Sequence, residues 1–358
     1  MTPPLPLTEV ERWLYQHVAP EPVESARAIY ELMASQSHHT LAEVYVPLNP
    51  LTAAHWSDVA RIADYVAHIP EGATRILDVG PGDGWPALPV ARRRPEVTVV
   101  GVDPSPRRAA VCAANAARLA IPNARFVVGD AGRLPFADAA FDAVIAASSL
   151  EEARDPEAVV SELARVLRPG GVLRASYQDW RLPASELETV DLWAGERAGP
   201  RGLGAAERLL LYTYVRRLQS PALERRYTLV LPADGPAAEA HADALVAAAG
   251  ATRAFGDAVL TPALGVPLLE RLAPHALRST VVEMRRWDTE WLIEALRGAG
   301  FASARGTPHP GELARHVGRD LIASGVAATL GPAFEEVASA IGRAAAARDG
   351  RELIEAVR

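Results

Sequence analysis

The stretch Arg75-Ile-Leu-Asp-Val-Gly-Pro-Gly-Asp-Gly-Trp85 decides the fold of this chain. A short apolar run is interrupted by glycines, and the residues from Ala87 onward suit a helix, with Pro86 tolerated in its first turn. The pattern predicts a buried strand, a glycine turn and a helix. Such a unit begins an α/β sheet that binds its ligand at the carboxyl ends of the strands, and Asp78 stands at that end.

The spacing of the glycines narrows the class of ligand. Gly80, Gly82 and Gly84 form G-x-G-x-G, whereas dinucleotide-binding proteins carry G-x-G-x-x-G. A phosphate-binding loop with a lysine is excluded, because all 37 basic residues are arginine. Taken alone, the turn also fits an ordinary strand-to-helix connection, so the sequence that follows has to decide.

The composition limits the number of domains and the classes of molecule that the protein is expected to bind. The 358 residues fit one large domain or two smaller ones, and 49% of them are hydrophobic, which allows a sizeable core. The net charge is −7 and the longest arginine run is Arg92 to Arg94, which disfavours an extended nucleic-acid interface. We expect a small-molecule substrate, no nucleic acid and no membrane partner, and a homodimer stays open.

The presence of a single cysteine and the absence of lysine exclude several kinds of metal and cofactor chemistry. Cys112 is the only cysteine, so we expect no multi-cysteine zinc site, no iron–sulfur cluster and no metal site. Without lysine there is no pyridoxal phosphate Schiff base. The chain shows neither a signal peptide nor a stretch of 18 apolar residues, so we expect a cytoplasmic protein. Its richness in alanine and arginine is typical of high-GC bacterial genomes.

Periodicity divides the chain into four expected parts. The first is an N-terminal helical cap over residues 1–74, with helices at 8–18, 22–35 and 52–69. The second, 75–180, alternates strands with helices and therefore predicts a doubly wound parallel sheet. Its later strands are expected at 97–102, 125–129, 141–146 and 171–177.

The other two parts are less regular. Residues 181–279 are expected to be a mainly helical insertion that covers the site as a lid, with helices at 205–218 and 237–249 and a strand at 227–231. Residues 280–358 are expected to complete the core sheet, through a helix at 287–298 and a strand near 302–306, and to end in a mostly helical tail over 332–357.

Three consecutive strands end in carboxylates, namely Asp78, Asp103 and Asp130. Each of the last two also fits helix capping. Along one sheet edge, however, the three would offer acceptors to an ammonium group, a ribose diol and an adenine amine. S-adenosylmethionine carries all three donors together with a positive sulfonium, which a negative potential helps to bind.

The motifs along residues 75 to 177 resemble class I S-adenosylmethionine-dependent methyltransferases, especially those acting on small molecules. The resemblance rests on Leu77-Asp-Val-Gly-Pro-Gly-Asp-Gly84, Gly101-Val-Asp103, Gly129-Asp-Ala-Gly-Arg-Leu-Pro-Phe136, Phe141-Asp-Ala-Val144 and Leu163-Ala-Arg-Val-Leu-Arg-Pro-Gly-Gly-Val-Leu173. It implies a seven-stranded Rossmann-like sheet with a reversed final strand.

The resemblance also implies roles for individual residues. Asp78 and the turn of Gly80, Pro81 and Gly82 would hold the methionine end of the cofactor. Asp103, followed by Pro104, would bind the ribose. Asp130 and the backbone amide of Ala131 would bind the adenine, and residues around Ser148 would line the sulfonium.

Two features depart from the family pattern. The segment between Arg181 and Ser279 is longer than the usual final connection, which leaves the sixth strand uncertain. The fourth strand ends in Ala146-Ala-Ser-Ser149, without the Asn/Asp-Pro-Pro-Tyr of enzymes that methylate nucleic-acid amino groups. That difference argues against methylation of adenine or of a glutamine amide.

The implied reaction is in-line displacement at the methyl carbon, with O, N or C of a small molecule as acceptor. The enzyme mainly positions the reactants, and a base is needed only when the substrate loses a proton. The candidate catalytic residues are His38, His39 and Glu151, each of which also fits an exposed loop position. The candidate substrate contacts are Tyr45, Tyr177 and Gln178, and Tyr45 is a further candidate base.

Three other functions remain as alternatives. The first is a non-methylating S-adenosylmethionine-dependent enzyme or binder. The second is an RNA or protein methyltransferase, which predicts a basic surface beside the pocket. A nicotinamide dehydrogenase fits least, because of the glycine spacing.

Overall fold

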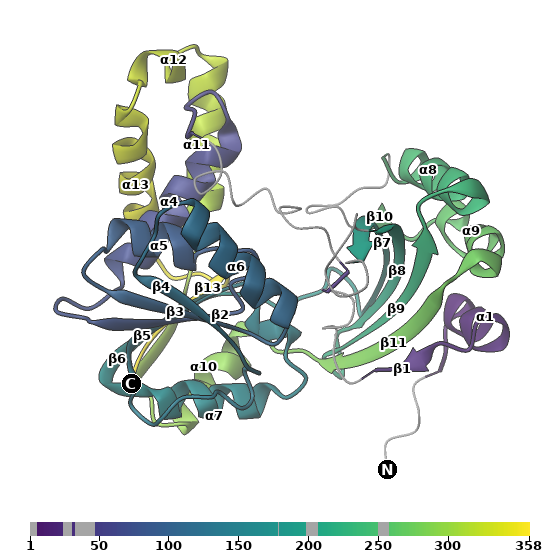
Figure 1. Cartoon of the computed structure of the whole chain (residues 1–358), viewed down its shortest axis with the longest axis horizontal. Helices are drawn as coiled ribbons and strands as arrows, with labels where there is room; N and C mark the ends of the chain where they lie inside the picture. Colours follow the sequence, from purple (N-terminus) through teal and green to yellow (C-terminus); the bar gives the residue numbers. More distant parts are fainter. Residues whose placement is uncertain (1–5, 24–30, 33–46, 178, 198–206, 250–257) are drawn as a thin grey trace. The chain divides into compact units, whose positions relative to one another are not determined.

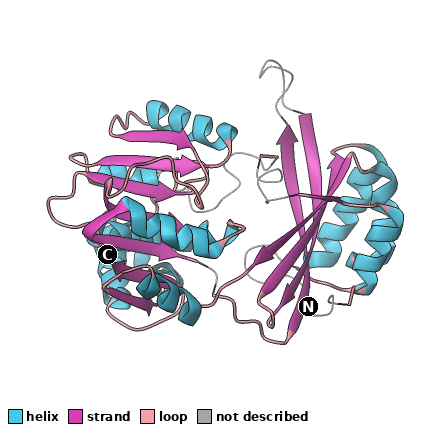
Figure 2. Cartoon of the chain, turned by 90° about the horizontal axis from the view of Figure 1, so that it is seen from below, coloured by secondary structure: helices cyan, strands magenta, loops and turns pink. Residues whose placement is uncertain are grey.

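A computed structural model describes residues 6–23, 31–32, 47–177, 179–197, 207–249 and 258–358. The chain divides into two compact units, one formed by residues 35–180 and 287–358 and the other by residues 1–34 and 181–286. Each unit has its own β-sheet and is described by itself (Figures 1 and 2).

The first of these units contains the glycine turn and a seven-stranded sheet in the order β12-β13-β6-β5-β2-β3-β4. The strands are β2 (Arg75–Val79), β3 (Thr98–Asp103), β4 (Ala124–Val128), β5 (Phe141–Ala147), β6 (Leu167–Ser176), β12 (Ser303–Thr307) and β13 (Leu353–Val357). The neighbours from β4 through β6 pair in parallel, whereas β13 runs antiparallel to both β6 and β12. The predicted seven-stranded, doubly wound sheet with a reversed last strand is confirmed.

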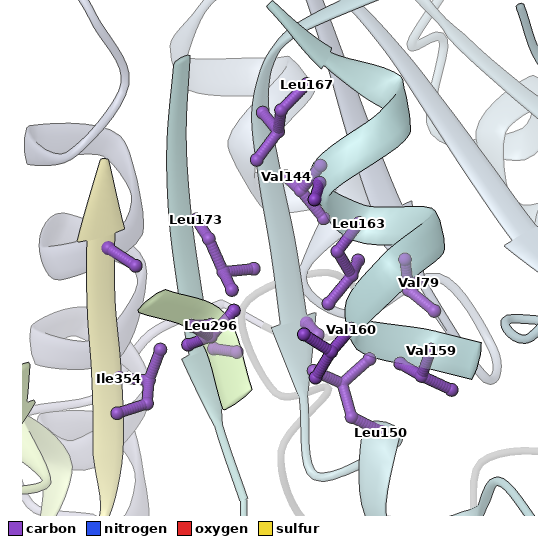
Figure 3. Close-up of a cluster of buried hydrophobic side chains, with 14 of the residues drawn as sticks. Val79, Val144, Leu150, Val159, Val160, Leu163, Leu167, Leu173, Leu296 and Ile354 are labelled. Carbon is purple, nitrogen blue, oxygen red and sulfur yellow. The ribbon is translucent and has the colours of Figure 1, made fainter. Parts of the chain in front are cut away.

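Helices pack on both faces of this sheet (Figure 1). On one face α4 (Ala53–Ala67), α5 (Ala87–Arg93) and α6 (Pro106–Arg118) share a core with β2, β3 and β5. On the other face α7 (Pro156–Val166) and α10 (Thr289–Gly298) pack on β5, β6 and β13. Figure 3 shows Val160 and Leu163 of α7 beside Val144 of β5, all buried. Because both faces are covered, the central strands are continuous apolar runs.

Three helices lie between β12 and β13 in the chain, namely α11 (Pro310–Ala323), α12 (Ala327–Leu330) and α13 (Ala333–Ala346). They pack against α4 through Trp56, Ala314 and Phe334. The expectation of a mostly helical tail over 332–357 is therefore wrong for its last residues, since β13 pairs between β6 and β12. A strand of only five residues shows little hydrophobic periodicity in the sequence, and the strands with which β13 pairs lie far away in the chain.

The other unit has a six-stranded sheet in the order β1-β11-β9-β8-β7-β10. Its strands are β1 (Glu21–Pro22), β7 (Glu186–Arg197), β8 (Glu207–Leu218), β9 (Leu223–Pro232), β10 (Ala258–Val259) and β11 (Arg278–Arg285). One face is covered by α1 (Glu9–His17), α8 (Gly235–Ala249) and α9 (Val266–Leu272) (Figure 2). Short 3-10 turns at Pro262–Leu264 and Ala273–His275 flank α9.

This unit corrects the prediction of a mainly helical insertion. The helix expected over 205–218 is strand β8, paired along its length with β7 and β9. Its run Leu-Leu-Leu-Tyr-Thr-Tyr-Val, residues 209–215, is rich in aromatic and β-branched side chains and is buried on both faces of the sheet. A strand buried on both faces has no polar alternation, and spacings of three or four then match apolar residues by chance. The expected strand at 227–231 and helix at 237–249 are present within β9 and α8.

The expected boundaries also change. The cap over residues 1–74 is not one piece, because α1 packs on the second sheet whereas α4 covers the first. Most of the helix expected at 22–35 lies outside the described residues, and Glu21–Pro22 form a short strand. Strand β11 belongs with the inserted sheet, so that unit ends at residue 286 and not at 279.

Candidate functional site

The site lies at the carboxyl edge of the first sheet, where β5, β2, β3 and β4 are neighbours. Asp78 is the fourth residue of β2 and Asp103 the last of β3, and these two strands pair directly. The charge of Asp103 acts on the Asp78 carboxyl. The two strands that carry these carboxylates are therefore neighbours at this edge of the sheet.

The glycine turn connects β2 to α5 through left-handed backbone. Gly80, Gly82 and Gly84 have φ values of 72°, 56° and 122°, a region that other residues enter only with strain. At Gly80 an added Cβ would stand 2.5 Å from Ser149 Cβ, whereas at Gly82 it would meet none of the described residues within 4 Å. The backbone at Gly82 is therefore open to a ligand, while Gly80 is fixed by packing.

Asp78 is fully buried and only partly satisfied. Its Oδ2 accepts a hydrogen bond from the backbone N–H of Ala87 at 2.8 Å. Its Oδ1 is buried, and in the described part of the chain no donor reaches it. Burial raises the pKa of this carboxyl well above its usual range, the Ala87 N–H opposes the shift, and Asp103 adds to it. A buried carboxylate oxygen without a donor fits a positively charged hydrogen-bond donor on a ligand.

Asp103 is 8% exposed and accepts a hydrogen bond from the backbone N–H of Ser105 at 2.8 Å. Burial raises the pKa of the Asp103 carboxyl, and the backbone N–H groups of Ser105 and Gly82 oppose that rise. The Gly82 N–H thus favours the charged form of the Asp103 carboxyl.

Three side chains of helix α6 contact the glycine turn and hold it in place. Arg108 forms a buried ion pair with Asp83, Asn115 Nδ2 donates to the carbonyl of Asp83 at 2.9 Å, and the Cys112 thiol donates to the carbonyl of Gly82 at 3.1 Å. The three side chains lie four and then three residues apart, on one face of the helix. Cys112 is therefore a buried packing residue that also contacts the turn.

The remaining predicted cofactor residues are more exposed. Asp130 follows β4 and accepts from the N–H of Gly132 at 2.7 Å, and Ala131 and Pro104 are half-buried. Ser148, directly after β5, is exposed and has φ 52°, a strained value for serine. Its N–H donates to the carbonyl of Ser176 at the end of β6.

The structure describes only two of the predicted catalytic and substrate residues. Glu151 lies in a short 3-10 helix, Leu150–Glu152, just beyond β5, and is 7% exposed. Tyr177 is buried in the core between β6 and α10, with its hydroxyl 2.6 Å from Thr289 Oγ1, which gives it a packing role. His38, His39, Tyr45 and Gln178 lie outside the described residues.

Three residues beside the site were not singled out from sequence. Tyr65 of α4 donates to the carbonyl of Ala146 at 2.8 Å, and burial raises its pKa to about 12. Arg61, one turn earlier, stacks over the ring of Trp85, the residue that follows the glycine turn. Their four-residue spacing on one helix face was the available signal.

The described residues form neither a metal-binding cluster nor a membrane-spanning helix. Among them, no group of three or more histidine, cysteine, aspartate or glutamate side chains is arranged to bind a metal ion. Nor does any of their helices have the length and apolarity needed to cross a membrane. A hollow of about 410 Å³ borders α11 and contains none of the predicted site residues.

A glycine turn between neighbouring acidic strand ends, in a sheet of this order, is typical of α/β domains that bind nucleosides. Residues 77–175 match the model of a methyltransferase domain family. A curated relative described as an uncharacterized methyltransferase, from Mycobacterium sp. (strain JLS), is 35% identical over 179 residues, which cover 49% of this chain and 66% of that protein. A demethylmenaquinone methyltransferase from Deinococcus radiodurans is 40% identical over 36% of this chain and 51% of its own length.

Among solved structures, the CcbJ methyltransferase from Streptomyces caelestis is 18% identical, covers 70% of this chain and 86% of that chain, and gives a TM-score of 0.43. The chain spans 66% or less of the length of the curated relatives it matches. Its seven-stranded unit belongs to the class I S-adenosylmethionine-dependent methyltransferase family.

Proposed function

We propose that this protein is an S-adenosylmethionine-dependent methyltransferase whose acceptor is a small molecule. The observation that carries the proposal is the buried Asp78 Oδ1, which no donor reaches within the described residues, next to the open backbone of Gly82. S-adenosylmethionine would supply an electrophilic methyl carbon on a sulfonium, and its ammonium group would provide the donor that Asp78 lacks.

In this proposal, the residues of this chain bind the cofactor and orient it. Asp78 accepts from the ammonium group and Asp103 from the ribose hydroxyls, while Asp130 and the Ala131 amide contact the adenine. The glycine turn lets backbone approach the ligand, and α6 holds that turn through Arg108 and Asn115. Binding at this edge places the acceptor near Ser148 and Glu151, just beyond β5.

The choice of a small-molecule acceptor rests on charge and on the end of the fourth strand. A net charge of −7 and short arginine runs disfavour a polyanion. The segment after β5 has serines in place of Asn/Asp-Pro-Pro-Tyr. Glu151 and the pair His38 and His39 are the proposed bases for an acceptor that loses a proton.

The cofactor site is tested by calorimetry with S-adenosylhomocysteine. Asp78→Ala and Asp103→Ala should each weaken binding roughly 10- to 150-fold, because each removes a hydrogen bond to a charged or well-ordered polar group. Asp138→Ala is the matched control, since that carboxylate is 81% exposed, and it should bind as the wild type does. Undiminished affinity in both site variants would refute the site.

The acceptor class is tested with a cofactor labelled in the methyl group. Label should enter small molecules of a cell extract and leave its RNA and protein unlabelled. Label in RNA or protein would contradict the acceptor class, and tight binding without any transfer would favour a non-methylating protein.

A further inference from the structure

Arg61 is a buried cation for which the described residues supply no counter-ion. The residue is 9% exposed, and its guanidinium carbon lies 5.0 Å from the centroid of the Trp85 ring. Within the described residues no carboxylate lies within 4 Å of its nitrogens, and its buried Nε has no acceptor. Two other buried arginines of the same unit are paired, Arg174 with Asp64 and Arg108 with Asp83. Burying a charge costs free energy unless the charge is paired. An anion bound beside Arg61 would therefore stabilise it.

An acidic residue on the same helix does not balance this charge. Asp58, one turn earlier on α4, is 2% exposed, and its Oδ2 has no donor within the described residues. Burial raises the pKa of Asp58 to about 7, against the opposing charges of Arg61 and Arg315. Burial thus disfavours the charged form of the Asp58 carboxyl, and no ion pair joins Asp58 to Arg61 in the described part of the chain.

A second donor lies next to Arg61. The indole Nε1 of Trp85 is buried and has no acceptor in the described part of the chain. Trp85 immediately follows Gly84, and its ring packs beside Ile62 of α4. The guanidinium and the indole N–H thus bring two unmatched donors to the glycine turn.

An unmatched acceptor is found in the same region. The charges of Arg61 and Asp78 both act on the hydroxyl of Tyr65, which lies at the carboxyl end of β5. Strand β2, which carries Asp78, pairs with β5 at Ala146, the residue that accepts from Tyr65. Arg61 lies one turn before Tyr65 on α4 and stacks on Trp85, so the unmatched Oδ1 of Asp78 and the donors of Arg61 and Trp85, which are opposite in kind, border the same edge of the sheet. A ligand group that carries both an anion and a cationic donor would satisfy all three.

We propose that Arg61, assisted by the indole N–H of Trp85, binds the carboxylate of a zwitterionic α-amino acid group whose ammonium is bound by Asp78. This inference rests on the proposed function, in which that group is the methionine end of the cofactor. Arginine suits the role because its planar fork matches a carboxylate. The protein then selects ligands that keep the amino acid group over nucleosides that lack it.

The experiment compares two ligands by calorimetry. S-adenosylhomocysteine carries the amino acid group, and 5′-methylthioadenosine has the same nucleoside and sulfur without it. In Arg61→Gln the dissociation constant for S-adenosylhomocysteine should rise roughly 10- to 100-fold, the range for a charge-assisted hydrogen bond. The constant for 5′-methylthioadenosine should change less than about threefold. Arg61→Lys should fall between wild type and Arg61→Gln, because it keeps the charge and loses the fork.

Two further variants keep the test decisive. Trp85→Phe preserves the ring and removes only the N–H, so it should weaken binding of S-adenosylhomocysteine alone. Arg315→Gln is the matched control, because Arg315 also acts on Asp58 but does not stack on Trp85, and it should leave both affinities unchanged.

The outcomes separate the two proposals. Equal weakening of both ligands in Arg61→Gln, or no weakening of either, overturns the role of Arg61. Wild-type protein that binds 5′-methylthioadenosine as tightly as S-adenosylhomocysteine also overturns it, while leaving the nucleoside site intact. Wild-type protein that binds neither ligand refutes the proposed function itself.

Discussion

Gly80 and Gly82 hold similar left-handed backbone, with φ values of 72° and 56°. Their surroundings differ, because an added Cβ would meet Ser149 at Gly80, whereas at Gly82 it would meet no atom of the described residues within 4 Å. Ser149 in turn donates through its hydroxyl to the carbonyl of Val79. One glycine therefore allows the turn to pack against the segment after β5, and the other leaves room over the turn.

This difference predicts separate effects for two alanine variants. Gly82→Ala should cost about 1 to 2 kcal/mol of stability from backbone strain alone, yet should abolish binding of S-adenosylhomocysteine by occupying the open side. Gly80→Ala should destabilise more, because it adds a contact of 2.5 Å with Ser149 Cβ. Thermal unfolding and calorimetry measure the two effects. Normal binding by a folded Gly82→Ala protein would contradict the assignment of that open side to the ligand.

At the scale of elements, α1 is joined to the second sheet by a buried carboxylate. Glu11 is fully buried and accepts from Arg216 at 2.6 Å, from the Tyr227 hydroxyl at 2.9 Å and from the backbone N–H of Thr8 at 2.9 Å. The last bond completes a capping box with Thr8. The same residue thus begins the helix and joins it to β8 and β9.

We expect Glu11→Gln to destabilise the protein by about 3 to 5 kcal/mol, because it leaves the buried Arg216 charge without its full partner. Glu9→Gln changes an exposed glutamate in the first turn of the same helix and should shift stability by less than about 0.5 kcal/mol. Denaturant unfolding compares the two variants. Equal stability of both would show that the buried network contributes little to the attachment of α1.

At the scale of the whole molecule, residues 181–286, which supply every strand of the six-stranded sheet except β1, are inserted between two adjacent points of the methyltransferase unit. The backbone N–H of Trp180 donates to the carbonyl of Trp287 at 3.2 Å, so the chain leaves and re-enters that unit at one place. Every strand of the seven-stranded sheet and every candidate cofactor residue lies outside the insertion.

A chain of residues 35–180 joined to 287–358 by a short glycine-serine linker should therefore fold. It should bind S-adenosylhomocysteine within about threefold of the full protein, because each unit is compact and has its own hydrophobic core. Circular dichroism and calorimetry provide the test, with Asp78→Ala in the shortened chain as the control for specific binding. Loss of folding would show that the two units depend on each other for stability.

The sequence by itself determined the parallel core and its acidic edge. Asp78, Gly82 and Asp103 were found because the local order of strand, turn and helix is written in contiguous residues, and parallel strands necessarily end at one edge. Residues that act through long-range packing were not found. Arg61 reaches the site only because α4 packs beside the glycine turn, and no local pattern shows that a buried arginine lacks a partner.

Only the tertiary structure decided which sheet each later segment joins. Strand β8 matched a helical spacing and β13 was too short to show one, yet both are strands because their hydrogen-bond partners lie elsewhere in the chain. Local propensity is worth fractions of a kcal/mol per residue, whereas a full set of paired backbone groups and buried side chains outweighs it. The order of β-strands in space, and with it the division into two units, is therefore a property of pairing across the chain and not of any single stretch.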